Sequence, residues 1–188
     1  VMMVMLVQKS YFNPYHEYAH SSYAAGQLRP KEEWMGIYWD QDKVGYTVST
    51  VKKRLKGYEL YEQVLMDLTV MGTPQRIDTR VTAQVNDAFI LRSFAFRLFS
   101  NLFTFTAQGK VRGNELHLEF VSGGKTTQTM IPLKENPYLS SSVKPLLLAQ
   151  GLTAGKRLSA TLFDPSTMSN APLEVVVAVS YTHLTLPT

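Results

Sequence analysis

The sequence contains no cysteine, which excludes disulfide bonds, thiolate metal sites and cysteine nucleophiles. Charged residues are also sparse, at 18% of the chain, and the formal net charge is only +4. This small, scattered charge argues against nucleic acid as a partner, because nucleic-acid binding needs a clustered basic surface. No stretch approaches the roughly 20 apolar residues that a membrane-spanning helix requires. With 188 residues, 45% of them hydrophobic, the chain is typical of one globular domain with a buried core.

The two ends of the sequence differ from its middle. Residues Val1–Val7 (VMMVMLV) are continuously apolar, and we interpret them as the outer end of a signal-anchor helix, with a buried strand as the alternative. Residues 1–31 then form the end of a membrane anchor and a juxtamembrane linker or short helix. The final stretch, Val179–Thr188 (VSYTHLTLPT), resembles a translated sequencing adaptor, so residues 180–188 are interpreted as a non-native tail. This interpretation puts residues 32–179 outside the inner membrane, facing the periplasm or the extracellular side.

The middle of the chain shows a hydrophobic pattern with a period of two. Between Gln75 and Val85, apolar or small residues alternate with polar ones, which places one face on a core and the other in water. Pairs of turn-forming residues separate this segment and later alternating segments. They predict two-residue hairpin turns at Asn86-Asp87, Gly113-Asn114 and Gly123-Gly124. An antiparallel meander is expected, because parallel pairing would need crossover helices. The alternation recurs in four further groups: Val44, Tyr46 and Val48; Val64, Met66, Leu68 and Val70; Phe103, Phe105, Ala107 and Val111; Leu116, Leu118 and Phe120.

One helix is expected late in the chain. It is predicted from an N-cap at Ser140 or Ser141 to a stop at Gly151, because apolar side chains between them recur at helical spacing. Two strands should follow, Arg157–Phe163 and Leu173–Val179, and the second, apolar on both faces, is expected in the interior. The fold class is therefore mainly β (α+β). We predict a curved antiparallel meander sheet or half-barrel of about eight to nine strands packed on one short helix, with a closed barrel as the alternative.

The sharpest chemical motif is HEYAH, in which His16, Glu17 and His20 match the H-E-x-x-H pattern of zinc hydrolases. On a helix this spacing puts both imidazoles on one face, with the glutamate as general base. A catalytic zinc needs a third protein ligand, and the remaining histidines are His117, in a predicted strand, and His183, in the tail. A zinc metallohydrolase is therefore the less favoured alternative, and we expect no cofactor.

Phenylalanines gather in the middle of the sequence. Phe94, Phe96, Phe103 and Phe105 are candidate ligand-binding residues, because a concave apolar surface can hold a lipid or a peptide. Aromatic side chains on neighbouring strands also form ordinary hydrophobic core, which is the simpler interpretation.

Two other motifs have simple structural explanations. The basic run KKRLK, Lys52–Lys56, can contact anionic lipid headgroups or an acidic partner, but a solvated loop between two strands explains it as well. The run GGKT, Gly123–Thr126, imitates the end of a phosphate-binding loop. The first glycine of that motif would fall at Glu119, and strands are predicted on both sides, so a hairpin turn is expected instead.

Four segments resemble the N-terminal region of bacterial membrane-anchored transglutaminase-like proteins. They are Glu32–Tyr46 (EEWMGIYWDQDKVGY), Leu68–Arg80 (LTVMGTPQRIDTR), Asn136–Arg157 (NPYLSSSVKPLLLAQGLTAGKR) and Leu162–Ser169 (LFDPSTMS). In that family a β-rich domain follows a single membrane anchor and precedes a papain-like domain with a Cys, His and Asp triad. This chain has no cysteine to carry the triad. The resemblance therefore implies a non-catalytic accessory domain, cut off before a catalytic domain of the cysteine protease or acyltransferase type.

The resemblance also implies partners. They are the cytoplasmic membrane through the N-terminal anchor, the downstream catalytic domain in cis, and a cell-envelope protein or peptide. A weaker likeness, to the curved half-barrels of periplasmic lipoprotein carriers, implies a hydrophobic-ligand carrier instead. A carrier predicts an apolar cavity lined by the phenylalanines and open to solvent.

Overall fold

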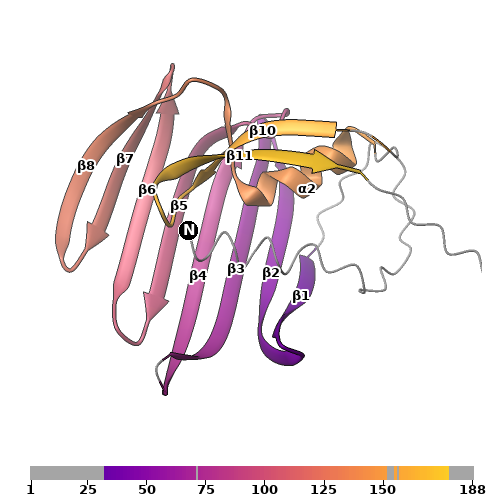
Figure 1. Cartoon of the computed structure of the whole chain (residues 1–188). Helices are drawn as coiled ribbons and strands as arrows, with labels where there is room; N and C mark the ends of the chain where they lie inside the picture. Colours follow the sequence, from indigo (N-terminus) through magenta and orange to yellow (C-terminus); the bar gives the residue numbers. More distant parts are fainter. Residues whose placement is uncertain (1–31, 71, 152–154, 156, 178–188) are drawn as a thin grey trace, which may run out of the picture.

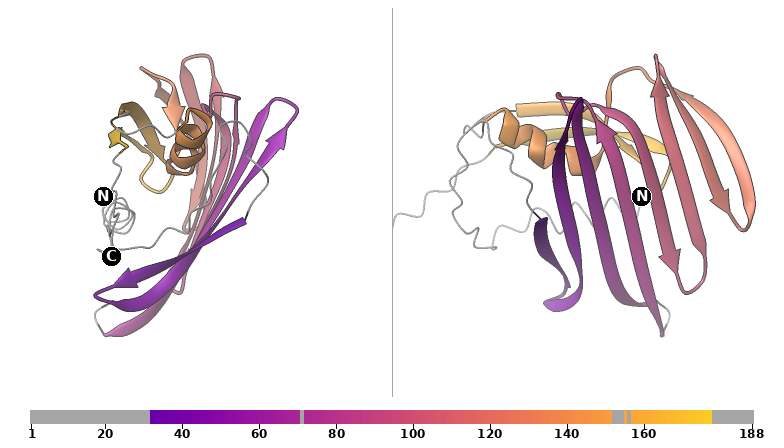
Figure 2. Two further views of the ribbon diagram at one scale, coloured as in Figure 1. Left: turned by 90° about the vertical axis from the view of Figure 1, so that its right-hand side faces the viewer. Right: turned by 180° about the vertical axis from the view of Figure 1, so that it is seen from behind.

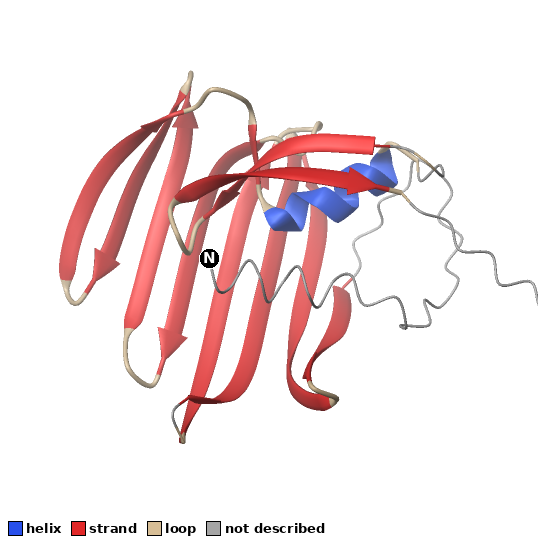
Figure 3. Ribbon diagram, in the orientation of Figure 1, coloured by secondary structure: helices blue, strands red, loops and turns tan. Residues whose placement is uncertain are grey.

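The structure is a computed structural model that describes residues 32–70, 72–151, 155 and 157–177. Two β-sheets and one helix make up this part of the chain (Figures 1 and 3). The strands of the large sheet are β1 (Glu32–Trp39), β2 (Asp42–Arg54), β3 (Gly57–Val70), β4 (Thr73–Val85), β5 (Leu91–Ser100), β6 (Thr104–Arg112), β7 (Glu115–Ser122) and β8 (Lys125–Pro132). They are followed by β9 (Pro137–Tyr138), α2 (Ser140–Ala149), β10 (Arg157–Asp164) and β11 (Ser169–Val176).

The large sheet is an antiparallel meander. Its eight strands lie in sequence order, from β1 at one edge to β8 at the other, and each pairs with its neighbours in the chain. The sheet is curved but does not close into a barrel (Figure 2). The predicted fold class is therefore confirmed as a curved open sheet packed on one short helix.

The connections between the strands agree with the predicted turns, except for the one after β4. Gly123 and Gly124 both have positive φ, 57° and 77°, as expected for a two-residue turn that matches the twist of a hairpin. The GGKT run is thus the β7–β8 hairpin. The predicted two-residue turn at Asn86-Asp87 is wrong, because residues 86–90 form a longer loop between β4 and β5. Asn86 closes this loop: its Oδ1 accepts the backbone N–H groups of Ala88 and Ile90, each at 2.9 Å.

A smaller sheet forms a second layer with α2 (Figure 1). It consists of the antiparallel hairpin of β10 and β11 and of β9, which pairs with β10 in parallel. This parallel pair was not expected, and α2 supplies the crossover that it needs. The predicted interior position of the last strand is wrong. As an edge strand β11 alternates between half-buried and exposed residues, and Val176 remains 49% exposed.

The helix begins and ends close to the predicted positions. Its N-cap is Leu139 and no side chain caps it, which corrects the assignment of that role to Ser140 or Ser141. At the other end Gly151 has a φ of 76°, a conformation that a glycine adopts without strain and that stops the helix.

The hydrophobic core lies between α2, β10 and one face of the large sheet, called here the inner face. Phe163 of β10 packs on Phe94 of β5, with ring centroids 5.3 Å apart. Gly109 on β6 makes room for this contact, because a Cβ there would lie 2.3 Å from the Phe94 ring. Each fully buried leucine or phenylalanine contributes about 1.5–3 kcal/mol. The core includes Leu60, Ala83, Val85, Phe89, Leu91, Phe94, Phe96, Ala107, Leu116, Leu118, Leu139, Leu146 and Phe163.

Candidate functional site

The four candidate phenylalanines do not share one surface. Phe94 and Phe96 are buried in the core, at 4% and 5% exposure, and Phe105 is half-buried against them. The rings of Phe96 and Phe105 lie 6.0 Å apart. Phe103 is 55% exposed and follows the end of β5. Three of the four rings thus belong to the hydrophobic core or pack against it, and a ligand-binding role for the set stays a prediction.

The HEYAH motif, with His16, Glu17 and His20, lies outside the described residues, as do the apolar start of the chain and its last residues. In the part that the structure describes, no group of His, Asp and Glu side chains is arranged to hold a metal ion. No helix in that part has the length and apolar character needed to cross a bilayer. The zinc site and the membrane anchor remain predictions.

The basic run Lys52–Lys56 lies at the β2–β3 hairpin rather than in a separate loop. Lys53 pairs with Asp87 of the β4–β5 loop and lies 4.2 Å from the ring centroid of Tyr58. Arg54 pairs with Glu59 at 2.7 Å. These partners tie the hairpin to the neighbouring loop and strand, which is a structural role.

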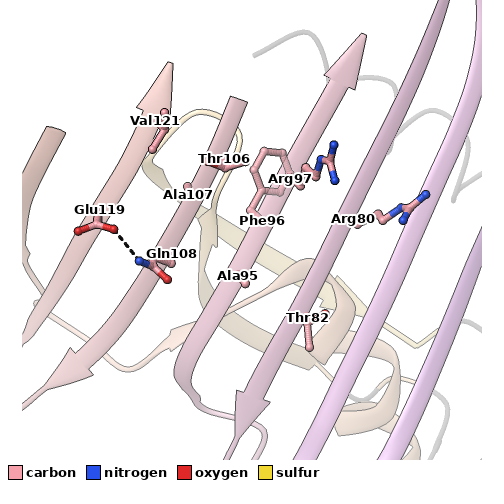
Figure 4. Close-up of a pocket in the computed structure, with 10 residues that line it drawn as sticks. All are labelled: Arg80, Thr82, Ala95, Phe96, Arg97, Thr106, Ala107, Gln108, Glu119 and Val121. Atoms are coloured by element: carbon pink, nitrogen blue, oxygen red, sulfur yellow. Dashed lines mark hydrogen bonds between the residues drawn. The ribbon is translucent and has the colours of Figure 1, made fainter. Parts of the chain in front are cut away.

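Successive side chains of a strand point to opposite faces of the sheet, so the large sheet also has an outer face, opposite to the inner one. A hollow of about 470 Å³ lies on this outer face (Figure 4). No described element covers it: α2 and the small sheet lie on the other side (Figure 2). The volume is within the range of ligand sites. The hollow crosses four strands, β4 to β7, and is lined by Arg80, Thr82, Ala95, Phe96, Arg97, Thr106, Ala107, Gln108, Glu119 and Val121.

A smaller hollow of about 150 Å³ adjoins it and shares the two arginines. Its other lining residues are Asp78 and Phe99, and the Phe99 side chain is 43% exposed. Arg80 lies directly opposite Arg97 in the pairing of β4 with β5. Both hollows are therefore lined by two arginines that lie side by side on neighbouring strands.

The charge of Arg80 is compensated within the sheet. Its Nε and Nη2 donate to the two carboxylate oxygens of Asp78, at 3.2 and 2.7 Å. Gln63 donates to the same carboxylate at 3.0 Å. Burial raises the pKa of Asp78, but these hydrogen bonds and the charges of Arg80 and Arg97 outweigh it and hold the pKa below its ordinary value. Asp78 is therefore ionised at neutral pH.

Arg97 acts on Asp78 through its charge but is not hydrogen-bonded to it. Its side chain forms no hydrogen bond or ion pair with any residue that the structure describes, and the position is exposed. At the far end of the hollow, Glu119 accepts hydrogen bonds from the amides of Gln108 and Gln128, at 2.7 and 2.8 Å. The hollow thus has a cationic end on β4 and β5 and an anionic end on β7.

The inner face also extends beyond the core. Met66 is buried, at 5% exposure, yet it stands outside the core cluster that α2 and β10 complete. Half-buried apolar residues of β1, β3 and β4 surround it in the sheet register: Ile37, Val64, Leu68 and Ile77. These residues and Met66, called here the lower inner row, extend the apolar inner face beyond the core.

Glu62 of β3 is the one inner-face carboxyl group whose pKa is raised among the described residues, and burial is the cause. It lies opposite Ser49 on one side and Val81 on the other. No described side chain donates a hydrogen bond to it. The arrangement disfavours its charged form.

Comparison of the chain with protein-family models, curated proteins and solved structures found no match.

Proposed function

We propose that this chain is a non-catalytic accessory domain that binds a cell-envelope peptide or protein outside the cytoplasmic membrane. It serves a membrane-anchored transglutaminase-like protein and acts beside that protein's catalytic domain. The observation that supports the binding role most is the outer face of the large sheet. It carries an open hollow lined by Arg97, which forms no ion pair or hydrogen bond with a described residue, and no described element covers it.

The resembling segments support the accessory role, because they fall on distinct structural units. Glu32–Tyr46 forms the β1–β2 hairpin, and Leu68–Arg80 spans the connection from β3 to β4. Asn136–Arg157 contains β9 and α2, and Leu162–Ser169 contains the turn between β10 and β11. The resemblance thus includes both the sheet and the layer that covers its inner face.

The native gene tests the accessory role. We expect the reading frame beyond Val179 to continue into a domain with cysteine, histidine and aspartate in papain-like order. A stop codon directly after this position would contradict the proposal, whereas a different catalytic domain would change the partner and leave the binding role to be tested separately.

The lower inner row favours a second function, a carrier of an acyl chain or similar hydrophobic ligand. Native mass spectrometry of gently purified protein would show bound lipid in the wild type and less in Met66→Thr. Phe99→Ser is the matched control, because Phe99 lies on the outer face and its loss leaves the row intact. Lipid-free wild-type protein would rule out the carrier.

A further inference from the structure

We propose that the outer-face hollow binds an extended peptide segment bearing a carboxylate, and that Arg97 holds this carboxylate. This inference rests on the proposed binding role and names the chemistry of its ligand.

The pairing of Arg80 with Arg97 is costly for the sheet. Directly opposed residues of an antiparallel pair have Cβ atoms about 4.5–5.5 Å apart, and like charges there destabilise the sheet. Arg80 and Arg97 occupy such a position. Asp78 forms its ion pair with Arg80 and interacts with Arg97 only through its charge, and no described residue makes an ion pair or hydrogen bond with Arg97. A bound anion would complete the charge pattern that the sheet leaves open.

The uncompensated charge at this end of the hollow matches a single carboxylate. The two arginines and Asp78 together carry +2 − 1 = +1 at this end of the hollow. One carboxylate balances that charge, whereas a phosphate dianion would exceed it. A planar guanidinium also matches a carboxylate through two parallel hydrogen bonds.

The hollow has the length and polarity to hold an extended peptide segment. It crosses from β4 to β7, which at about 4.8 Å between neighbouring strands is roughly 14 Å, the length of about four extended residues. The hydroxyls of Thr82 and Thr106 and the amide of Gln108 line the path and can bond a peptide backbone. Glu119 at the far end repels an anion and accepts N–H donors, so the carboxylate is directed to Arg97.

The test is a titration of the full 188-residue chain with two peptides, followed by NMR shifts of backbone and arginine N–H groups. The probes are acetyl-Ala-Glu-Ala-amide and its neutral counterpart acetyl-Ala-Gln-Ala-amide. We expect the glutamate peptide to bind at least tenfold more tightly, with the largest shifts on β4 and β5. Equal binding of the two peptides would overturn the proposal.

Two arginine variants test whether Arg97 is the residue that binds the carboxylate. Arg97→Gln should weaken binding of the glutamate peptide at least tenfold, and Arg112→Gln, an exposed arginine at the end of β6, should leave it within twofold of wild type. Arg97→Gln should keep or raise the melting temperature, because it removes the repulsion from Arg80. Unchanged peptide binding in this variant would overturn the assignment.

Acetate and inorganic phosphate separate the possible sources of the anion. Both should bind more weakly than the glutamate peptide, because neither contacts the threonines and Gln108. Acetate as tight as the peptide would rule out the peptide segment, and tighter phosphate would rule out the carboxylate. These results leave the accessory role standing, whereas a stop codon after Val179 would remove that role and leave this site intact.

Discussion

At the scale of single residues, Gly57 is the clearest case of a backbone requirement. It has a φ of 96°, and a Cβ there would lie 1.9 Å from the carbonyl oxygen of Val85. We expect Gly57→Ala to lower the free energy of unfolding by about 2–4 kcal/mol, through backbone strain and this clash. Urea unfolding monitored by circular dichroism measures the loss. Gly123→Ala is the control: its φ is 57° but open space surrounds it, so the cost should be about 1 kcal/mol.

Glu62 predicts a pH dependence of stability. Its carboxyl has an ordinary pKa of 4.5 in the unfolded chain and a raised pKa in the folded one. Its contribution to stability is therefore fully present below pH 4.5 and is lost as the pH rises through the folded pKa. We expect Glu62→Gln to stabilise the protein at pH 7 relative to wild type, with the gain shrinking towards pH 4. Denaturant titrations at several pH values measure this difference.

The control for that experiment is Glu174→Gln. Glu174 is 61% exposed in its ion pair with Arg157. An exposed pair contributes about 0–1 kcal/mol, so this variant should stay close to wild type. A gain in Glu62→Gln that does not depend on pH would contradict the explanation by burial of the charge.

At the scale of elements, α2 is held by its buried side chain rather than by its caps. Leu146 is 5% exposed, and no side chain caps the helix N-terminus. We expect Leu146→Ala to cost about 2–4 kcal/mol, because it leaves a cavity between the helix and the sheet. Lys144→Ala removes an exposed ion pair with Glu33 of β1 and should cost less than about 1 kcal/mol. Thermal unfolding of both variants tests whether packing or the ion pair holds α2.

The elements also show what the sequence alone could predict. Period-two runs predict the eight-stranded meander because each strand pairs with its neighbour in the chain, so local alternation and turn residues contain the necessary information. A strand of two residues, β9, has no periodicity to detect. Its parallel partner could not be predicted, because α2 and the chain on either side of it separate the two strands.

The outer-face site depends on the pairing register of β4 with β5, which the predicted two-residue turn would have shifted. A two-residue turn at Asn86-Asp87 would have paired Arg80 with Ser93. The loop 86–90 and the irregularity near Val85 instead bring Arg97 opposite Arg80. The sequence does place arginines at alternating positions of two adjacent strands, which indicates a basic patch on one face. The pairing of Arg80 with Arg97 could be predicted only from the correct length of the loop between the strands. The phenylalanines of the same strands could be assigned to a face without that register, because alternation alone decides the face.

At the scale of the whole molecule, the two layers share one core and should unfold together. Phe163, Leu139 and Leu146 of the second layer belong to the same cluster as the residues of the large sheet. Both tryptophans, Trp34 and Trp39, lie on β1, so fluorescence reports on one edge of the sheet while circular dichroism reports on all strands. We expect the two unfolding transitions to coincide.

The variant Phe163→Ala extends this test. It should shift both transitions by the same amount, with a loss of about 3–5 kcal/mol, because its ring packs on Phe94 at the centre of the core. A fluorescence transition that precedes the circular dichroism transition would show that β1 unfolds independently of the remaining sheet.

The meander has a consequence for the order in which the chain folds. Each strand from β2 to β8 pairs with the one synthesised just before it, so the sheet can grow strand by strand as the chain emerges. Leu139, Leu146 and Phe163 arrive only afterwards. A nascent chain stalled before Pro137 would present a finished but uncovered apolar surface, which makes that interval the step at which a chaperone is most needed.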